Sequence, residues 1–113
     1  MAPPFVELNG CAEADYVAGK NIDFGNIYYA PRCLSARAGD TVTWTTAGFG
    51  FAAHPLQPGI APGVRSDGPG TAPTPLTPVL SGAGASFTFD KPGIYPYYCR
   101  THESQMSGAV YVH

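Results

Sequence analysis

Short runs of alternating apolar and polar residues recur along this chain, and they are bounded by glycine and proline. Alternation with a period of two is typical of β-strands that bury one face, whereas the 3.6-residue period of a helix is hard to find. The clearest run is 41–46, with Val42 and Trp44 on one face. The same criterion predicts strands at 5–8, 22–29 (interrupted at Gly25-Asn26), 41–46, 86–90, 94–99 and 109–112. Several short strands at this spacing predict an all-β sandwich or barrel.

The middle of the chain departs from this pattern. Residues 55–82 hold seven of the twelve prolines and five glycines. Because proline has no N–H to donate to a β-ladder, we predict a long surface loop here rather than a central strand. Loops of this length are uncommon inside compact domains and are usually functional or disordered. Five apolar residues are spaced so that they could pin the loop to the body: Leu56, Ile60, Val64, Leu76 and Leu80.

Composition narrows the classes of function. The 113 residues fit one domain, so we expect a single domain over 1–113. The formal net charge of −2 and the lack of any basic run argue against nucleic acid or an anionic membrane as partner. No apolar stretch approaches the ~20 residues of a spanning helix. The N-terminus does not resemble a signal peptide, and we expect that a natural leader has been removed and Met1 added for expression.

Three cysteines form an odd set. Cys11 and Cys33 lie in the first third of the chain, while Cys99 stands alone, three residues before a histidine. We therefore expect a disulfide between Cys11 and Cys33 and a free thiolate at Cys99, as suits a secreted protein. The alternative is a cytosolic protein with three buried, reduced cysteines, because connectivity cannot be deduced from sequence.

Candidate chemistry concentrates at the end of the 94–99 strand. Cys99, His102 and Met106 place a thiol, an imidazole and a thioether within eight residues. Thiolate and thioether ligands favour copper or iron–sulfur chemistry, and one cysteine is too few for an iron–sulfur cluster. Structural zinc sites are four-coordinate with cysteine and histidine. Two histidines and a cysteine with a weak axial methionine are the blue-copper arrangement, so a second histidine is needed.

His54 is the candidate for that second histidine. It follows the 41–46 strand in an apolar setting, and the remaining histidine, His113, is the last residue of the sequence. Considered alone, His54 would be interpreted as a core histidine bonded to a backbone carbonyl. In combination with Cys99 and His102 we interpret it as a metal ligand.

Two segments resemble a known family. The run Gly93-x-Tyr-x-Tyr-Tyr-Cys-x-x-His closely matches the start of the ligand loop in plastocyanins and pseudoazurin-like cupredoxins. Upstream, the run from Ala38 to Trp44, AGDTVTW, is similar to the strand turn before those proteins' first histidine. The resemblance implies a Greek-key β-sandwich of about eight strands with one type 1 copper ion. It also implies a mobile carrier of single electrons in the periplasm or outside the cell.

The resemblance assigns four metal ligands by position: His54, Cys99, His102 and Met106. Cys99 would be the copper thiolate, the two histidines the neutral equatorial imidazoles, and Met106 the long axial thioether. The spacing departs from the pattern, because three residues separate His102 from Met106 where plastocyanins have four and amicyanins two. Gln105 stands where an amicyanin would place its methionine and is the alternative axial ligand.

Pro55 is a second departure from the pattern. Plastocyanins carry asparagine after the first histidine, and its backbone N–H points at the cysteine sulfur, whereas proline has no N–H. Hydrogen bonds around that sulfur tune the potential. We therefore predict that Pro55, considered singly, lowers the reduction potential.

Electron transfer through His102 would follow from this assignment. We expect His102 to be the most exposed ligand of a monomer, and redox proteins to dock transiently beside it. Its apolar surroundings would include Pro55, Phe51 and Met106.

The tyrosines of the 94–99 strand have two possible roles. Tyr98 is either a second, remote route for electrons or a cross-strand packing residue. Tyr95 and Tyr97 are expected in the core.

Other functions could use some of the same residues. A copper store or chaperone would use the same ligands without redox cycling. A hydrolase with Cys99 as nucleophile would need a base, an orienting group and an oxyanion hole, and no glycine run beside Cys99 supplies the last. A multicopper oxidase would need more than three histidines, so we expect no enzyme. A metal-free adhesion sandwich would leave the cysteine, histidine and methionine cluster unexplained.

Overall fold

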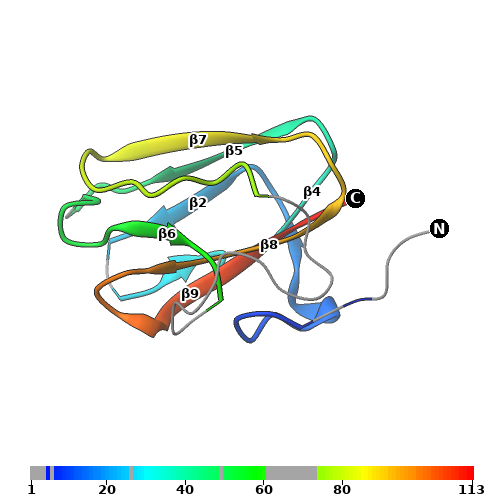
Figure 1. Cartoon of the computed structure of the whole chain (residues 1–113), viewed down its shortest axis with the longest axis horizontal. Helices are drawn as coiled ribbons and strands as arrows, with labels where there is room; N and C mark the ends of the chain where they lie inside the picture. The colour runs from blue at the N-terminus through cyan, green and yellow to red at the C-terminus, as the bar shows by residue number, and fades with distance from the viewer. Residues whose placement is uncertain (1–4, 6, 26, 49, 61–73) are drawn as a thin grey trace.

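Two β-sheets pack face to face in the computed structural model (Figure 1). The structure describes residue 5 and residues 7–25, 27–48, 50–60 and 74–113, with the backbone alone at 103 and 104. Within these residues the strands are β1 (Val17–Ala18), β2 (Asn21–Phe24), β3 (Tyr29–Ala30), β4 (Cys33–Ala36), β5 (Asp40–Thr45), β6 (Leu56–Pro58), β7 (Gly84–Phe89), β8 (Gly93–Cys99) and β9 (Glu103–Val112). One sheet has the order β1-β4-β9-β8-β6 and the other β3-β2-β5-β7. The all-β sandwich predicted from the sequence is confirmed, with nine strands in the described part where about eight were expected.

The core between the sheets follows the predicted alternation. Val42 and Trp44 on β5 are fully buried. Thr41 faces outward, and its hydroxyl lies 2.8 Å from that of Thr88 on the neighbouring β7. A strand with one apolar and one polar face has only one register that buries the apolar set, which is why the pattern located β5 and β7 well.

β8 is buried along its whole length. On its inner side it faces the main core, and a second, smaller cluster lies on the other side of the sheet. That cluster consists of Leu8, Cys11, Cys33, Ile94 and Ala109. Since β8 is also flanked by β6 and β9 within the sheet, its end, which carries Cys99, is held from several directions.

The predicted strand at 5–8 is wrong for the residues described there; residue 6 lies outside them. Leu8 forms only an isolated bridge. Asn9 and Gly10 then turn the chain with positive φ angles of 51° and 76°. A left-handed pair of residues suits asparagine and glycine and ends an extended run, so the apolar alternation had no room to become a strand.

A disulfide and one side chain fasten this N-terminal segment instead. The expected Cys11–Cys33 disulfide is present, with a Cα–Cα distance of 5.7 Å. The Asn9 amide donates to the backbone carbonyls of Tyr97 at 3.0 Å and Gly108 at 2.9 Å, on β8 and β9. The segment is therefore attached to the strands that lead to Cys99.

Two further differences concern strands. The predicted strand at 22–29 is a hairpin, because β2 and β3 pair antiparallel, with Phe24 opposite Tyr29. β4 was not predicted. It runs parallel to β9 and its residues are mostly buried. A parallel strand covered on both faces loses the alternation that would reveal it.

The proline-rich middle is only partly a loop. Leu56–Pro58 forms β6 at the edge of the five-stranded sheet, where a proline needs no ladder donor. Leu56 and Leu76 are buried as expected, but Leu80 is 54% exposed and does not pin the segment. Residues 61–73, which include Val64, lie outside the described residues.

Candidate metal centre

A short reversal after β8 holds Cys99 and His102 together. The register between β8 and β9 shifts at Tyr98/Cys99, so that Cys99 pairs with Glu103. The backbone N–H of Gln105 donates to the carbonyl of His102 at 2.9 Å and closes the turn. Irregular pairing of this kind re-aims side chains at the end of a strand. The relative position of Cys99 and His102 is thus a local property of the chain.

His54 reaches the site from the segment between β5 and β6. Its backbone N–H donates to the carbonyl of Gly50 at 3.1 Å, and the N–H of Phe51 donates to the carbonyl of Gly82 at 2.8 Å. A Cβ placed on Gly50 would lie 2.3 Å from the Gly82 oxygen, so a larger residue does not fit there. Phe51 is fully buried. The position of His54 therefore depends on contacts between segments far apart in sequence.

One backbone hydrogen bond joins the two ligand segments. The N–H of Arg100 donates to the carbonyl of Pro55 at 2.9 Å. Leu56 on β6 pairs with Cys99 on β8 in the adjoining ladder. The residue after His54 is thereby attached to the residue after Cys99.

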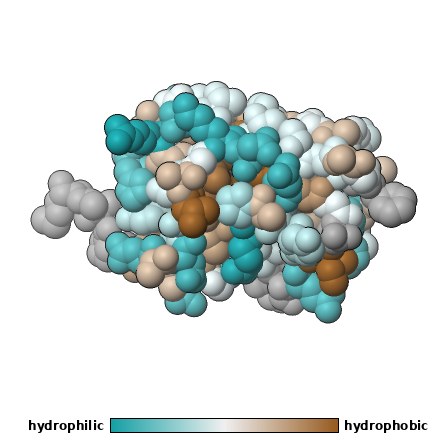
Figure 2. Space-filling view, turned by 180° about the vertical axis from the view of Figure 1, so that it is seen from behind, coloured by the Kyte–Doolittle hydropathy of each residue, from teal (hydrophilic) through white to brown (hydrophobic). Residues whose placement is uncertain are grey.

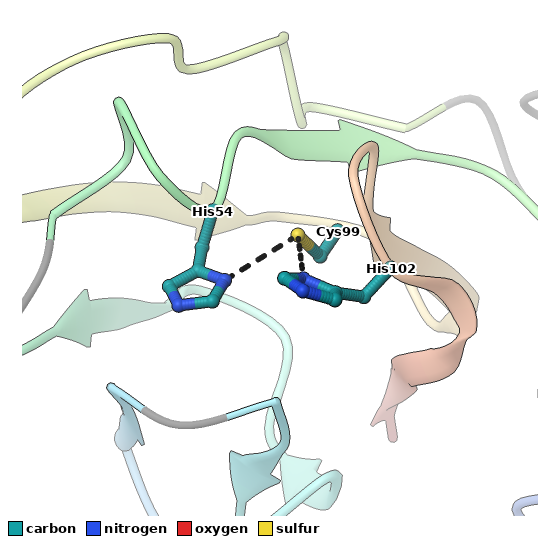
Figure 3. A group of neighbouring side chains, drawn as sticks. All are labelled: His54, Cys99 and His102. Carbon is teal, nitrogen blue, oxygen red and sulfur yellow. Dashed lines mark hydrogen bonds between the residues drawn. The ribbon is translucent and has the colours of Figure 1, made fainter.

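Three candidate ligand atoms converge between these segments (Figure 3). The Sγ of Cys99 lies 3.8 Å from Nδ1 of His54 and 3.6 Å from Nδ1 of His102. All three ligand atoms lie within 4.8 Å of one another. Figure 3 shows the sulfur facing both imidazole rings, with a dashed line to a nitrogen of each. A triangle of this size accommodates one metal ion at ordinary bond lengths of about 2.0–2.3 Å.

The three side chains differ in exposure. Cys99 is fully buried and His54 is 6% exposed, while His102 is half-buried. Burial lowers the pKa of His54, and the nearby His102 lowers it further. Both effects favour the neutral imidazole, which is the form that binds a metal.

The donor set fits copper. One thiolate and two imidazoles are ligands that copper accepts, and their trigonal grouping is the equatorial arrangement of blue-copper sites. The set was expected as His54, Cys99 and His102, and the structure brings these three together.

The two candidates for the axial ligand are placed differently. Met106 on β9 is fully buried in the same core cluster as Cys99. Gln105, the alternative, has an exposed side chain.

The expected apolar docking patch is wrong in part. Phe51 and Met106 are fully buried and contribute nothing to the surface, and of the three residues named only Pro55 is partly exposed. Phe51 and Met106 were expected among the apolar surroundings of His102, but their side chains pack into the core. On the face shown in Figure 2, apolar residues form small groups separated by polar surface.

The tyrosines of β8 are all buried. Tyr95 and Tyr97 belong to the core as predicted. Tyr98 is only 7% exposed, which favours the packing role over a surface route for electrons.

Phe24 is a neighbour of the site that the sequence did not indicate. Its ring packs edge-on to the imidazole of His54, with centroids 6.4 Å apart. It also packs on Phe51 at 4.7 Å. Phe24 was visible only as an apolar position in a predicted strand, and nothing in its spacing pointed to His54.

A β-sandwich that brings one buried cysteine and two histidines together at the ends of its strands is a cupredoxin, the class of blue-copper proteins. The chain belongs to the family of copper binding proteins described as the plastocyanin/azurin family, whose pattern matches residues 17–113. Its His54, Cys99 and His102 group is suited to one copper ion.

Individual relatives agree with this family. The chain is similar to a chloroplastic plastocyanin of Tetradesmus obliquus, with 33% identity over 94 residues, which are 80% of this chain and 61% of that protein. Among solved structures it is similar to an amicyanin mutant in the reduced state, with 30% identity and a TM-score of 0.56, covering 82% of this chain and 80% of that one. A purple cupredoxin from Nitrosopumilus maritimus, at 24% identity and a TM-score of 0.57, covers 84% of this chain and 100% of that one, and shows the fold alone.

In the part of the chain that the structure describes, none of the helical segments has the length and apolar character needed to cross a membrane.

Proposed function

We propose that this protein carries single electrons between redox proteins, using one type 1 copper ion held by His54, Cys99, His102 and Met106. The observation that carries the proposal is the convergence of the Cys99 sulfur and one ring nitrogen from each of His54 and His102 within 4.8 Å of one another. Family membership supports the choice of copper.

Each ligand has its own part in this proposal. The Cys99 thiolate supplies the strong equatorial bond, and the neutral imidazoles of His54 and His102 complete the plane. Burial of Met106 in the cluster that contains Cys99 supports it as the axial ligand, since the exposed Gln105 would have to turn inward. A copper ion in such a site gains or loses one electron without needing a change of ligands.

The protein holds the ligands rigidly and shields most of them from water. Gly50 and Gly82 hold the His54 segment, and the Arg100–Pro55 hydrogen bond joins it to the Cys99 turn. Ligands held in this way move little between the two oxidation states, which favours fast transfer. Cys99 and His54 are shielded from water, so His102 is the ligand closest to a docked partner.

The electron balance is simple. One electron enters from a reduced partner protein and one electron leaves to an oxidised partner, and no proton or bond needs to be exchanged. We propose brief docking of a monomer beside His102. The Cys11–Cys33 disulfide supports a location outside the cytoplasm, in the periplasm or extracellular space. This role needs no catalytic group, and we propose that the protein is a carrier rather than an enzyme.

Absorption after addition of Cu(II) tests this proposal first. We expect an intense band near ~600 nm from the Cys99 thiolate, and a reversible one-electron wave in voltammetry. Cys99→Ser should abolish the band. Tight Cu(I) binding with no reversible wave would instead indicate a copper store, and a colourless protein would contradict both.

The axial ligand needs its own comparison. Met106→Gln should change the spectrum and the potential, whereas Gln105→Ala should leave both unchanged. The reverse outcome would assign the axial position to Gln105.

A further inference from the structure

Tyr29 is a buried tyrosine with an unpaired hydroxyl. It lies on β3, is 3% exposed, and its hydroxyl has no hydrogen-bond partner in the part of the chain that the structure describes. Two other core tyrosines are satisfied: Tyr95 donates to the carbonyl of Lys91, and Tyr97 to that of Arg32. A buried hydroxyl without a partner is costly, so its position calls for a physical explanation.

The ring of Tyr29 contacts two aromatic residues that are themselves close to proposed ligands. It packs edge-on to Tyr97 at a centroid distance of 4.7 Å, and Tyr97 precedes Cys99 by two residues on the same face of β8. The same ring also packs against Phe24 at 6.2 Å, and Phe24 packs on the imidazole of His54. Tyr29 is therefore a neighbour of the metal centre, although it is not one of the ligands.

The electrostatics agree with this placement. Burial raises the pKa of the Tyr29 phenol, and the negative charge of Cys99 raises it further. No hydrogen bond joins the Tyr29 hydroxyl to the Cys99 sulfur in the part of the chain that the structure describes, so an effect of one on the other would act through space. Beside a thiolate, which can only accept, a phenol hydroxyl is stabilised when its hydrogen points toward the sulfur.

We propose that Tyr29 is a positioning residue of the copper centre, whose O–H dipole stabilises negative charge on the Cys99 sulfur and so raises the reduction potential. The proposal rests on the proposed function. Reduction adds one electron to the centre, and a dipole with its positive end toward the sulfur favours the more negative state. The residue after His54 is Pro55, which has no N–H to direct at the sulfur, so a nearby hydroxyl dipole would matter more in this chain.

Tyr29→Phe tests the proposal because it removes the hydroxyl and keeps the ring. We expect the blue band to remain and the equilibrium constant for reduction to fall at least threefold, which is a potential lower by about 28 mV at 59 mV per tenfold. Tyr95→Phe is the matched control. It removes a buried hydroxyl at the opposite end of β8 and should leave the potential unchanged, although it loses a hydrogen bond.

A second readout separates tuning from simple packing. Thermal unfolding of both variants is measured with a chelator, with Cu(II) and with Cu(I). If the hydroxyl acts on the centre, Tyr29→Phe should change stability by different amounts in the three forms, whereas Tyr95→Phe should change it equally. A fluorinated tyrosine at position 29, which is a stronger donor, should shift the potential upward.

Three results would overturn the inference: an unchanged or higher potential in blue Tyr29→Phe, equal stability changes in all three forms, or no upward shift with the fluorinated residue. In each case the proposed function would stand, because the wild-type protein would still be blue and reversible. A wild-type protein without the blue band would remove the proposed function and this inference with it.

Discussion

The two proposed histidine ligands reach Cys99 in different ways. His102 lies in the same turn as Cys99, three residues further on, and is half-buried. His54 lies 45 residues earlier in sequence and is almost fully buried. Its segment is held by the approach of Gly50 to Gly82 and by the Phe51 side chain.

This difference shows that one centre combines two kinds of support. The Cys99–His102 side is a short covalent connection that leaves its imidazole near solvent. The His54 side depends on packing between distant segments, so it should be more sensitive to changes in the core and less accessible from outside. Each of the following predictions tests that contrast.

Removal of either imidazole should have the largest effect. His102→Gly and His54→Gly should both lose the ~600 nm band of the copper protein, because each removes an equatorial ligand. Added imidazole should restore the band at much lower concentration in His102→Gly, since that position is half-buried and His54 is 6% exposed. An absorbance titration with imidazole measures both. Equal rescue at the two positions would contradict the difference in access.

Crowding the His54 segment should have the next largest effect. Gly50→Ala places a Cβ 2.3 Å from the Gly82 carbonyl oxygen and should destabilise the fold by about 1–3 kcal/mol in urea unfolding. It should also weaken copper binding, because the backbone N–H of His54 donates to the carbonyl of Gly50. Gly48→Ala is the control, since its Cβ would meet nothing closer than 3.8 Å. Similar losses in both variants would show that the Gly50–Gly82 approach is not what holds His54.

Substitutions of Pro55, where the two ligand segments are joined, should have a smaller effect, which is a shift in the reduction potential. Pro55→Asn and Pro55→Ala both restore a backbone N–H while keeping the carbonyl that accepts from Arg100. A new donor toward the Cys99 sulfur should raise the potential by about 30–60 mV, between threefold and tenfold in the equilibrium constant. Voltammetry of the two variants distinguishes a backbone effect from an effect of the Asn side chain. An unchanged or lower potential would contradict the prediction.

The pH dependence of the copper-free protein should show the smallest effect. The folded-state pKa of His54 is lowered below the unfolded value of about 6.5. The unfolded chain therefore binds the proton more readily, so stability is lost as pH falls from about 7 toward the folded pKa. Urea midpoints measured with a chelator between pH 5 and 7.5 should fall with acid, and His54→Gln should flatten this slope. His113→Gln should keep it, and a slope that survives in His54→Gln would assign it to another group.

Much of the site could be predicted from the sequence because it is local. Cys99 and His102 are separated by two residues at the end of an alternating strand, so their proximity needs no knowledge of the fold. The chemistry of a thiol beside an imidazole then points to copper. The strands around Trp44 and Phe87 were also predicted, since the side chains of each alternate between a more exposed and a more buried face.

Predictions that relied on the environment of a residue were less successful. Phe51 and Met106 were placed at the surface, and a strand was expected at 5–8; the structure contradicts each. An apolar side chain beside a ligand in sequence can face solvent or core, and only the packing of both sheets decides which. β4 was missed because a strand buried beside parallel neighbours has no alternation to detect.

The sequence by itself determined the class of fold, the chemical identity of the donors and the spacing of Cys99 from His102, because alternation and short covalent connections act over a few residues. Tertiary structure decided where His54 lies, which ligand is accessible, and that the ring of Tyr29 is buried against Tyr97. These depend on contacts such as Gly50 with Gly82 and Tyr29 with Tyr97. Residues so far apart along the chain meet only when the two sheets close on one core, and no local pattern records the geometry of that closure.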